Sequence, residues 1–351
     1  MARHYLEQAI CEMNISQILV IGENAGRTHQ RIEALLRLGY SVDVVSHSEQ
    51  LTFFNRVCNK LGFPRDWTNL NKRVLSQLSK TKHDLAWVEK CLVLKQATLT
   101  KIKKNYPGLK IIWYSEDDMT ARHNQSYYFK KSLSLYDVVF TTKSYNCDPE
   151  ELPALGAKKV VFVDKSYDPT FHRPIDITDE DKRNFGSAVG FIGTFEIDRF
   201  QKMLFLAKKG IKVRIWGNGW KAAMNAHPNL QVENKPIYAD NYIKAICATS
   251  INLCFLRKIN RDLQTDRTAE IPACGAFMLA ERTNEHARLF EENREAAYFD
   301  INNPDELYEK VVYYLANEDE RLAIARAGLE RCQRGKYTHD EKLRYMLSFL
   351  Q

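Results

Sequence analysis

The sequence contains no apolar run long enough to cross a bilayer. Its longest apolar runs are six to eight residues, whereas a membrane-spanning helix needs roughly 20. The first sixteen residues, MARHYLEQAICEMNIS, have neither an apolar core nor a small-residue cleavage site, so we expect no signal peptide. These absences favour a cytoplasmic protein, with peripheral contact at the inner face of the membrane as an open alternative.

Paired cysteines are absent as well. The eight cysteines are scattered and none forms a C-x-x-C pair, while Cys247, Cys254 and Cys274 lie inside apolar runs. Such cysteines are typical of reduced thiols in a core rather than of a zinc site or a disulfide framework. Reduced thiols again indicate the cytosol.

Several well-known catalytic motifs are missing too. The chain has no P-loop, no H-E-x-x-H and no Ser-His-Asp arrangement. The turn after the first apolar run is G-x-x-x-G, with Asn24 between Gly22 and Gly26, in place of the dinucleotide G-x-G-x-x-G. No acid follows at the distance of a ribose ligand, which argues against a dehydrogenase. The Gly22 turn stays a candidate for close backbone approach to a ligand.

Positive charge is present in excess, with 51 Lys and Arg against 44 Asp and Glu and a net charge of +7. Basic clusters occur at 101–104, 130–131, 158–159 and 208–209. Most such clusters are solvated helix faces. The functional alternative is attraction to an anion, namely a nucleotide diphosphate, a phospholipid surface or a nucleic acid, and charge alone does not choose among them.

Predicted strands and helices alternate along the whole chain, which is typical of α/β proteins. The first series predicts a doubly wound domain over residues 1–164. The polar segment 165–184 has two prolines and an acidic run, which is typical of an interdomain linker. The second series predicts a domain over 185–336, and the amphipathic helix 337–351 is a candidate to pack back on the first domain.

Residues 49–80 are predicted to be helical, with a break near 62–64. Phe53, Phe54 and Trp67 in this segment are either core residues or parts of an exposed amphipathic flap that touches a membrane or an apolar acceptor. Both interpretations are open at the level of sequence.

Polar side chains crowd into one turn of the second series, between the apolar run 251–256 and a predicted helix. In an open α/β sheet such a turn lies at the carboxyl end of a strand, where ligands bind. A cluster of this density is hard to explain by folding alone, so this turn is the leading candidate site. Its members are Arg257, Lys258, Arg261, Asp262, Thr265, Asp266, Arg267, Thr268 and Glu270.

Two further glycine-bearing strand ends belong to the same predicted domain. Backbone N–H groups at such turns and at helix N-termini suit phosphate. For each base alone a surface role is the commoner explanation, and for the set at strand ends we favour phosphate binding. The candidates for ligand binding in these two segments are Gly193, Thr194, Arg199, Lys202, Gly217, Gly219 and Trp220.

Acids at two strand ends could carry chemistry. Glu270 either contacts the dipole of its helix or holds a ribose diol through two hydroxyl hydrogen bonds, and Asp262 would contact sugar hydroxyls. In the first domain, Asp118 belongs to an acidic strand end, SEDDM, with His123 five residues on. We rank acceptor binding or general-base catalysis by these two above metal binding.

The stretch DLQTDRTAEIPACGAFMLAERTNE and its continuation to Cys332 resemble the C-terminal half of CgeB-like glycosyltransferases, which are relatives of the retaining family-four glycosyltransferases. Arg267, Glu270 and the PACGAF run are the most specific part of the resemblance. FIGTFEIDR and IWGNGW look like the upstream strand ends, and the first half of the chain fits more loosely.

This resemblance implies an α/β protein of the GT-B fold, with two Rossmann-like doubly wound domains facing across a cleft. It implies a retaining, metal-independent, hexosyltransferase-type enzyme with no cofactor other than its nucleotide-sugar co-substrate, UDP- or GDP-linked. The acceptor would be a glycan, a glycolipid or a protein, in cell-surface glycan or glycoconjugate synthesis.

The resemblance also implies roles for single residues. Glu270 matches the second of two donor-binding glutamates, and Asp262 falls at the position of the first with a shorter reach. Arg199 and Lys202 are the nearest equivalents of the diphosphate-binding bases, a role that Arg267 could share.

Two other functions stay open. One is a catalytically weak nucleotide-sugar-binding protein, for which Asp262 is the favouring feature. The other is a glycosyltransferase that acts on nucleic acid, which the charge permits but no aromatic–basic stripe supports.

Overall fold

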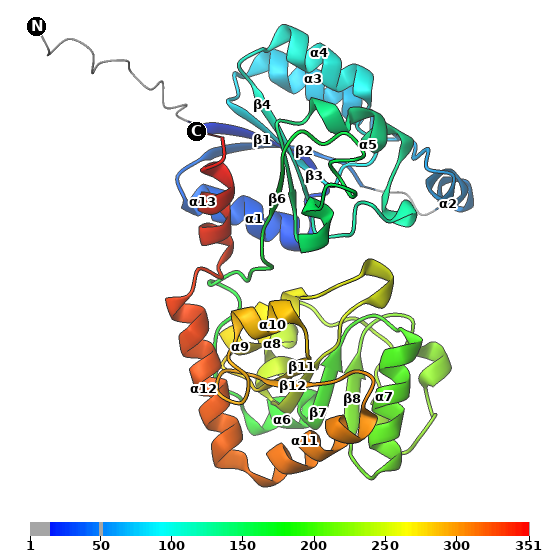
Figure 1. The fold of residues 1–351 in the computed structure, drawn as a ribbon, viewed down its shortest axis with the longest axis vertical. Coiled ribbons are helices and arrows are strands. Elements are labelled where there is room, and N and C mark those ends of the chain that lie inside the picture. Colours follow the sequence, from blue (N-terminus) through cyan, green and yellow to red (C-terminus); the bar gives the residue numbers. More distant parts are fainter. Residues whose placement is uncertain (1–14, 49–51, 351) are drawn as a thin grey trace, which may run out of the picture. The chain divides into compact units, whose positions relative to one another are not determined.

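The computed structural model describes residues 15–48 and 52–350 (Figure 1). Residues Asp164–His339 form one compact unit, unit 2, and the described residues on either side of it form the other, unit 1. Cys11 and the N-terminal segment for which no signal peptide is expected lie outside the described residues, as do residues 49–51 of the predicted helix 49–80.

Unit 1 is built on a six-stranded parallel sheet of order β2-β1-β3-β4-β5-β6. Its central strands read as nearly continuous apolar runs, as parallel strands covered on both faces do; all five residues of β3 are buried. The strands are β1 Gln17–Gly22, β2 Ser41–Ser46, β3 Leu85–Glu89, β4 Lys110–Ser115, β5 Val138–Thr141 and β6 Val160–Phe162.

Alternate residues of β1 face the two helical layers of unit 1, because successive strand side chains point to opposite faces. Leu19 and Ile21 pack in one apolar cluster, with the helices α3, α4 and α5. Ile18 and Val20 pack in the other, with α1 and α13. The helices of this unit are α1 Gly26–Arg37, α2 Phe53–Lys60, α3 Leu70–Lys80, α4 Gln96–Asn105, α5 Tyr127–Ser132 and α13 His339–Leu347.

The C-terminal helix α13 thus belongs to unit 1 although it follows the last helix of unit 2. Leu343, Met346 and Leu347 are buried in the same cluster as Trp87 of β3. Arg37 of α1 also forms an ion pair with Asp340, at 2.8 Å. The chain therefore closes unit 1 with a segment from its own C-terminus.

Unit 2 repeats the architecture with a six-stranded parallel sheet of order β12-β11-β10-β7-β8-β9. Its strands are β7 Ser187–Ile192, β8 Val213–Trp216, β9 Leu230–Val232, β10 Thr249–Cys254, β11 Met278–Glu281 and β12 Ala297–Phe299. Its helices are α6 Asp179–Phe185, α7 Ile197–Lys208, α8 Ala239–Cys247, α9 Asp266–Ala273, α10 Asn284–Leu289, α11 Pro304–Ala316 and α12 Glu318–Arg334.

The segment 165–184, which its composition presents as a linker, is an integral part of unit 2. Tyr167 and His172 are 5% and 3% exposed, and Tyr167 bridges to Thr338 in a short parallel pairing. The last residues of the segment begin helix α6. The composition of the segment did not indicate its burial, because its buried residues are aromatic or polar rather than aliphatic.

Each sheet has one point where its strand order reverses direction. In unit 1 this point lies between β1 and β3, and in unit 2 between β7 and β10. Ligands of open α/β sheets bind outside the carboxyl ends of the strands at such points. No helix among the described residues is long and apolar enough to span a membrane.

Candidate functional site

Arg199 of α7 joins the loop after β7 to the loop after β10. These two strands flank the switch point of unit 2, the point where its strand order reverses. The Nε of Arg199 donates to the carbonyl oxygen of Leu256 at 3.2 Å, and its Nη1 donates to that of Thr194 at 3.1 Å. The side chain is only 2% exposed, and burial lowers the pKa of Arg199 to about 10, with Arg267 and Arg257 acting in the same direction. Arg199 therefore fixes the loops rather than projecting into solvent.

The same two loops are linked by ion pairs. Arg257 contacts Glu196 at 3.2 Å, and Lys258 contacts Asp198 at 2.5 Å. Asp262 accepts hydrogen bonds from the Asn260 side chain at 2.9 Å and from the backbone N–H of Arg257 at 3.4 Å. Asp262 thus closes its own loop, while both bases are about half exposed. Lys202 lies partly buried in the following turn of α7, and Arg261 is exposed with a positive φ of 46°.

The loops after β7 and β8 approach so closely that only glycine fits. Gly217 has φ +148°, and a Cβ there would lie 1.9 Å from the carbonyl oxygen of Gly193. Trp220 donates its indole N–H to that oxygen at 2.8 Å, and Gly219 has φ +84°. Trp220 itself is fully buried. In the structure Trp220 holds the Gly193 loop through its indole hydrogen bond, and a ligand contact of Trp220 stays a prediction.

Helix α9 brings Arg267 to the switch point. Arg267 donates from Nη2 to the Thr265 hydroxyl at 3.3 Å. Its Nε and the Nη2 of Arg199 are buried donors without a hydrogen-bond partner among the described residues. The buried Arg199 and the partly buried Arg267 thus each have one such donor atom. The two guanidinium groups are close enough to affect each other's charge, and together they form a cradle that an anion would complete.

Glu270 lies deeper than its predicted role suggests. Its side chain is 3% exposed, it accepts a hydrogen bond from the Tyr242 hydroxyl, and its Oε1 lies 3.5 Å from Nε2 of His172. The carboxylate is therefore enclosed by side chains from α8 and from the segment 165–184. Neither partner could be read from the local sequence of α9.

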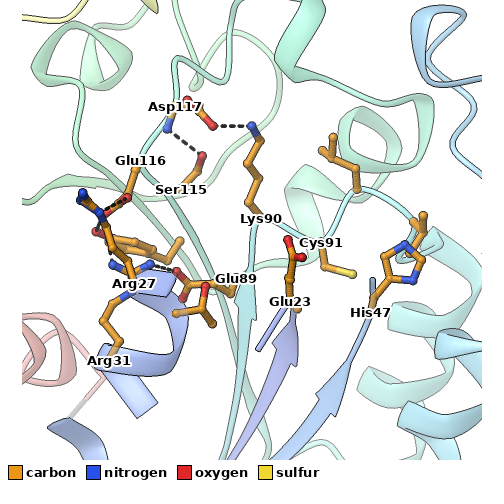
Figure 2. A pocket seen from close by; sticks show the side chains of 15 residues that line it. Glu23, Arg27, Arg31, His47, Glu89, Lys90, Cys91, Ser115, Glu116 and Asp117 are labelled. Atoms are coloured by element: carbon orange, nitrogen blue, oxygen red, sulfur yellow. Dashed lines mark hydrogen bonds and ion pairs between the residues drawn. The ribbon is translucent and has the colours of Figure 1, made fainter. Parts of the chain in front are cut away.

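Unit 1 has a cavity of about 530 Å³ at its own switch point, outside the carboxyl ends of β1, β3 and β4 (Figure 2). Arg31 of α1 lies against its inner wall with 6% exposure. The cavity is lined by Gly22, Glu23, Arg27, Thr28, Arg31, His47, Glu89, Lys90, Cys91, Leu92, Val93, Tyr114, Ser115, Glu116 and Asp117.

Acids and bases alternate around this cavity. Arg31 pairs with Glu89 and, through Nη1, with Glu116 at 3.0 Å, and Lys90 pairs with Asp117. Burial raises the pKa of Glu89 above its ordinary value, against the opposing effect of Arg31. Burial alone would lower the pKa of Arg31, but the two carboxylates outweigh it and raise that pKa. The charged side chains of the cavity wall thus balance one another.

The structure places the predicted site residues of unit 1 in different surroundings. Gly22 lines the cavity, and a Cβ there would lie 2.6 Å from the carbonyl oxygen of Glu89. Asn24 and Gly26 lie in the turn that begins α1. Asp118, however, is 1% exposed, and its Oδ1 accepts bonds from Thr120 and Asn146 in a turn.

Asp118 and His123 are not among the residues that line the cavity; His123 is exposed on the following loop. Glu116 and Asp117, their neighbours, line it instead. The sequence analysis did not identify Arg27 and Arg31. Their spacing of four residues, at the start of the helix after the Gly22 turn, places both on one face of that helix and could have indicated them.

Comparison with known proteins gives a family match and several similar solved structures. Residues 199–348 match a protein family described as glycosyl transferase-like, and no curated protein matches the sequence. Sucrose-phosphate synthase from Thermosynechococcus elongatus has a similar structure, with a TM-score of 0.68 and 12% identity over 96% of this chain and 98% of that one.

The chain has the GT-B fold. The Anabaena protein HepE in complex with UDP-glucose matches with a TM-score of 0.63 and 12% identity, over 95% of this chain and 99% of its own. An alpha-glucosyltransferase in complex with UDP and a DNA 13-mer matches with a TM-score of 0.65 and 13% identity, over 95% and 98%. The predicted α/β fold of two Rossmann-like domains is thereby confirmed, and identities this low speak for the fold alone.

Proposed function

We propose that this protein is a glycosyltransferase that takes its sugar from a nucleotide-diphosphate sugar bound at the switch point of unit 2. The observation that carries the proposal is the pair of buried, unsatisfied guanidinium donors on Arg199 and Arg267, within the region that matches a glycosyl transferase-like family. The UDP complexes among the solved GT-B structures support UDP as the nucleotide.

The proposed chemistry is stabilisation of a leaving diphosphate. As the sugar departs, negative charge develops on the diphosphate, and preorganised cations lower the energy of that state without a protein nucleophile. Arg267 and the N-terminus of α9 would contact the anion. Arg257 and Lys258 are held by exposed ion pairs, which contribute little in water, so a diphosphate could replace Glu196 and Asp198 as their partner.

The unit 1 cavity is the proposed acceptor site. Its balanced acids and bases suit a polar, hydroxyl-rich acceptor better than a strongly anionic one. Glu116 and Asp117 are the candidates to orient an attacking hydroxyl. Retention of configuration and independence of a metal ion are part of the proposal through the sequence resemblance.

A thermal-shift titration with UDP, GDP and their sugar conjugates tests the donor site. We expect UDP to raise the melting temperature of the wild type, and Arg267→Ala to weaken UDP binding by about tenfold or more, since a charged hydrogen bond contributes about 1.5–3 kcal/mol. Arg326→Ala, at an exposed position of α12, is the matched control. Absence of any shift with both nucleotides would overturn the proposal.

The role of Glu270 needs a separate variant because the residue is buried. Glu270→Gln keeps its shape and one acceptor oxygen. If the carboxylate holds the ribose, this variant loses affinity for UDP but not for free diphosphate. Equal affinity for UDP in wild type and variant would assign Glu270 to the Tyr242–His172 network alone.

A nucleotide-sugar-binding protein without turnover is the second candidate. It is favoured by Asp262, whose carboxylate is already engaged by Asn260 and the Arg257 backbone. Incubation with UDP-sugars separates the two functions. Slow donor hydrolysis supports the enzyme, and tight binding without hydrolysis or transfer supports the binding protein.

A further inference from the structure

An exposed group of apolar side chains lies on unit 1 at α2, α5 and the loop after α2. We call it, together with its basic neighbours, the aromatic–basic patch. Phe53 is 84% exposed and Leu61 is 69% exposed, so each leaves most of its apolar surface in water. Figure 1 shows α2 at the periphery of unit 1. The apolar members are Phe53, Phe54, Leu61, Phe63, Trp67 and Tyr127.

Several of these side chains contact one another rather than standing singly. Phe63 stacks on Tyr127 with ring centroids 5.1 Å apart. The Arg65 guanidinium lies 4.0 Å from the ring centroid of Trp67 and 5.2 Å from that of Phe54. Single exposed apolar residues need no explanation, but a contiguous patch marks an interaction site.

With the exception of Asp66, the charged residues of the patch segments 52–67 and 121–132 are basic. Residues 52–65 and 121–132 contain six bases and no acid, and all six bases are exposed. The adjacent Asp66 accepts hydrogen bonds from the backbone of Leu70 and Asn71 at the start of α3. The six bases are Arg56, Lys60, Arg65, Arg122, Lys130 and Lys131.

We propose that the aromatic–basic patch docks unit 1 on an anionic phospholipid surface. Exposed aromatic and aliphatic side chains insert at the level of the headgroups, and bases beside them pair with anionic lipids. A second copy of this chain fits poorly, because a two-fold interface would place the same six bases opposite one another. Nucleic acid fits less well. Its bases would stack on the aromatic rings, but the exposed aliphatic side chain of Leu61 would have no partner.

The patch adjoins the unit 1 cavity. His47 and Val93 line that cavity and also a small hollow formed with Arg65 and Trp67. Docking through the patch would thus bring the cavity mouth close to the lipid surface. The binding surface itself requires no glycosyltransferase activity, so it can be tested independently of the function proposed above.

Flotation of the full chain with vesicles tests the proposal. We expect binding to vesicles of phosphatidylcholine with phosphatidylserine, weakened by salt, and little binding to phosphatidylcholine alone. Phe53→Ser with Leu61→Ser should abolish it. Arg56→Glu with Lys60→Glu should lower the partition coefficient by at least 25-fold, at about fivefold for each base lost.

Two double variants in unit 2 serve as matched controls. Tyr238→Ser with Leu322→Ser removes two exposed apolar side chains, and Lys208→Glu with Arg326→Glu reverses two exposed bases. Neither should change vesicle binding, and all variants should melt at the wild-type temperature. Wild-type protein that fails to float with anionic vesicles, or patch variants that float as well as the controls, would overturn the proposal. Binding of single-stranded DNA that needs the patch while vesicle binding does not would assign the surface to nucleic acid instead.

Discussion

The hydroxyl of Thr268 donates a hydrogen bond to Nε2 of His286 at 2.9 Å, and the other ring nitrogen explains the direction. Nδ1 lies 2.6 Å from the carbonyl oxygen of Glu281. A carbonyl oxygen only accepts, so Nδ1 carries the hydrogen and Nε2 of the neutral ring accepts. Thr268 in turn accepts from the backbone N–H of Thr265 at 3.0 Å. A chain of hydrogen bonds thus connects the N-terminus of α9, the proposed anion site, to the end of β11.

Thr268→Val should break this chain. The substitution leaves the Thr265 N–H and the His286 Nε2 without partners in a fully buried place, which costs about 1–3 kcal/mol for each unsatisfied group. We expect a loss of about 2 kcal/mol or more in the free energy of unfolding of unit 2, measured by urea denaturation. Thr268→Ser keeps the hydroxyl and should lose less than Val does; equal losses would show that the methyl group, not the hydrogen bond, stabilises the site.

Glu281 and His286 give unit 2 two opposite responses to pH. Burial raises the pKa of the Glu281 carboxyl to about 7 and lowers the pKa of His286 to about 4. The raised carboxyl pKa contributes stability below pH 4.5 that is lost as the pH rises to about 7. The lowered His286 pKa contributes stability above pH 6.5 that is lost as the pH falls to about 4. Between these limits the two groups offset each other.

In the Glu281→Gln variant, of these two groups only His286 should change the stability of unit 2 with pH. The variant lacks the ionisation that costs the folded state about 3 kcal/mol at pH 8. The stability of the variant relative to wild type should therefore rise by up to this amount between about pH 4.5 and pH 8. On acidification the stability of the variant should fall more steeply than that of the wild type. Urea denaturation across this pH range measures both. A difference between variant and wild type that does not change with pH would show that Glu281 titrates as an exposed carboxyl does.

The sequence predicts the scaffold better than the contacts of the site. Continuous apolar runs such as residues 18–21 are a local signal of a parallel strand, because both faces of such a strand are covered. The strand ends at Gly22, Gly193 and Gly217 are local signals too. The partners of a buried polar group are not local signals. Arg31, on the helix that follows β1, contacts Glu89 of β3 because β1 pairs with β3. The sequence around either residue does not show that pairing.

The same reasoning explains why the burial of three candidate site residues does not follow from the sequence. Trp220, Asp118 and Glu270 are candidates because of their residue type at a strand end or helix start. Their burial depends on distant segments, such as Tyr242 and His172 for Glu270. Arg199 shows the limit most clearly, since the sequence predicts a phosphate contact and the structure adds that the side chain joins two loops.

Arg31→Met should destabilise unit 1 strongly. The variant leaves Glu89 buried without its cation, and removing one partner of a buried ion pair costs about 3–5 kcal/mol. We expect a loss of this size in the free energy of unfolding of unit 1. In the double variant Arg31→Met with Glu89→Gln no buried charge is left unpaired, and much of the loss should be recovered. A double variant no more stable than the single one would place the contribution of Arg31 in its packing over the Tyr114 ring.

Gly217→Ala tests the close approach of the two glycine loops beside the proposed donor site. A Cβ at residue 217 would lie 1.9 Å from the Gly193 carbonyl oxygen, well inside van der Waals contact, so one loop must move. We expect a loss of more than about 2 kcal/mol, from strain at positive φ and from the clash, together with loss of any UDP-induced thermal shift. Gly210→Ala separates the two causes, because Gly210 also has a positive φ, +93°, but nothing within 4 Å of the added Cβ. That control should cost about 1 kcal/mol and keep the response to UDP. If both variants lost stability equally and bound UDP equally, the contact between Gly217 and Gly193 would have no part in shaping the site.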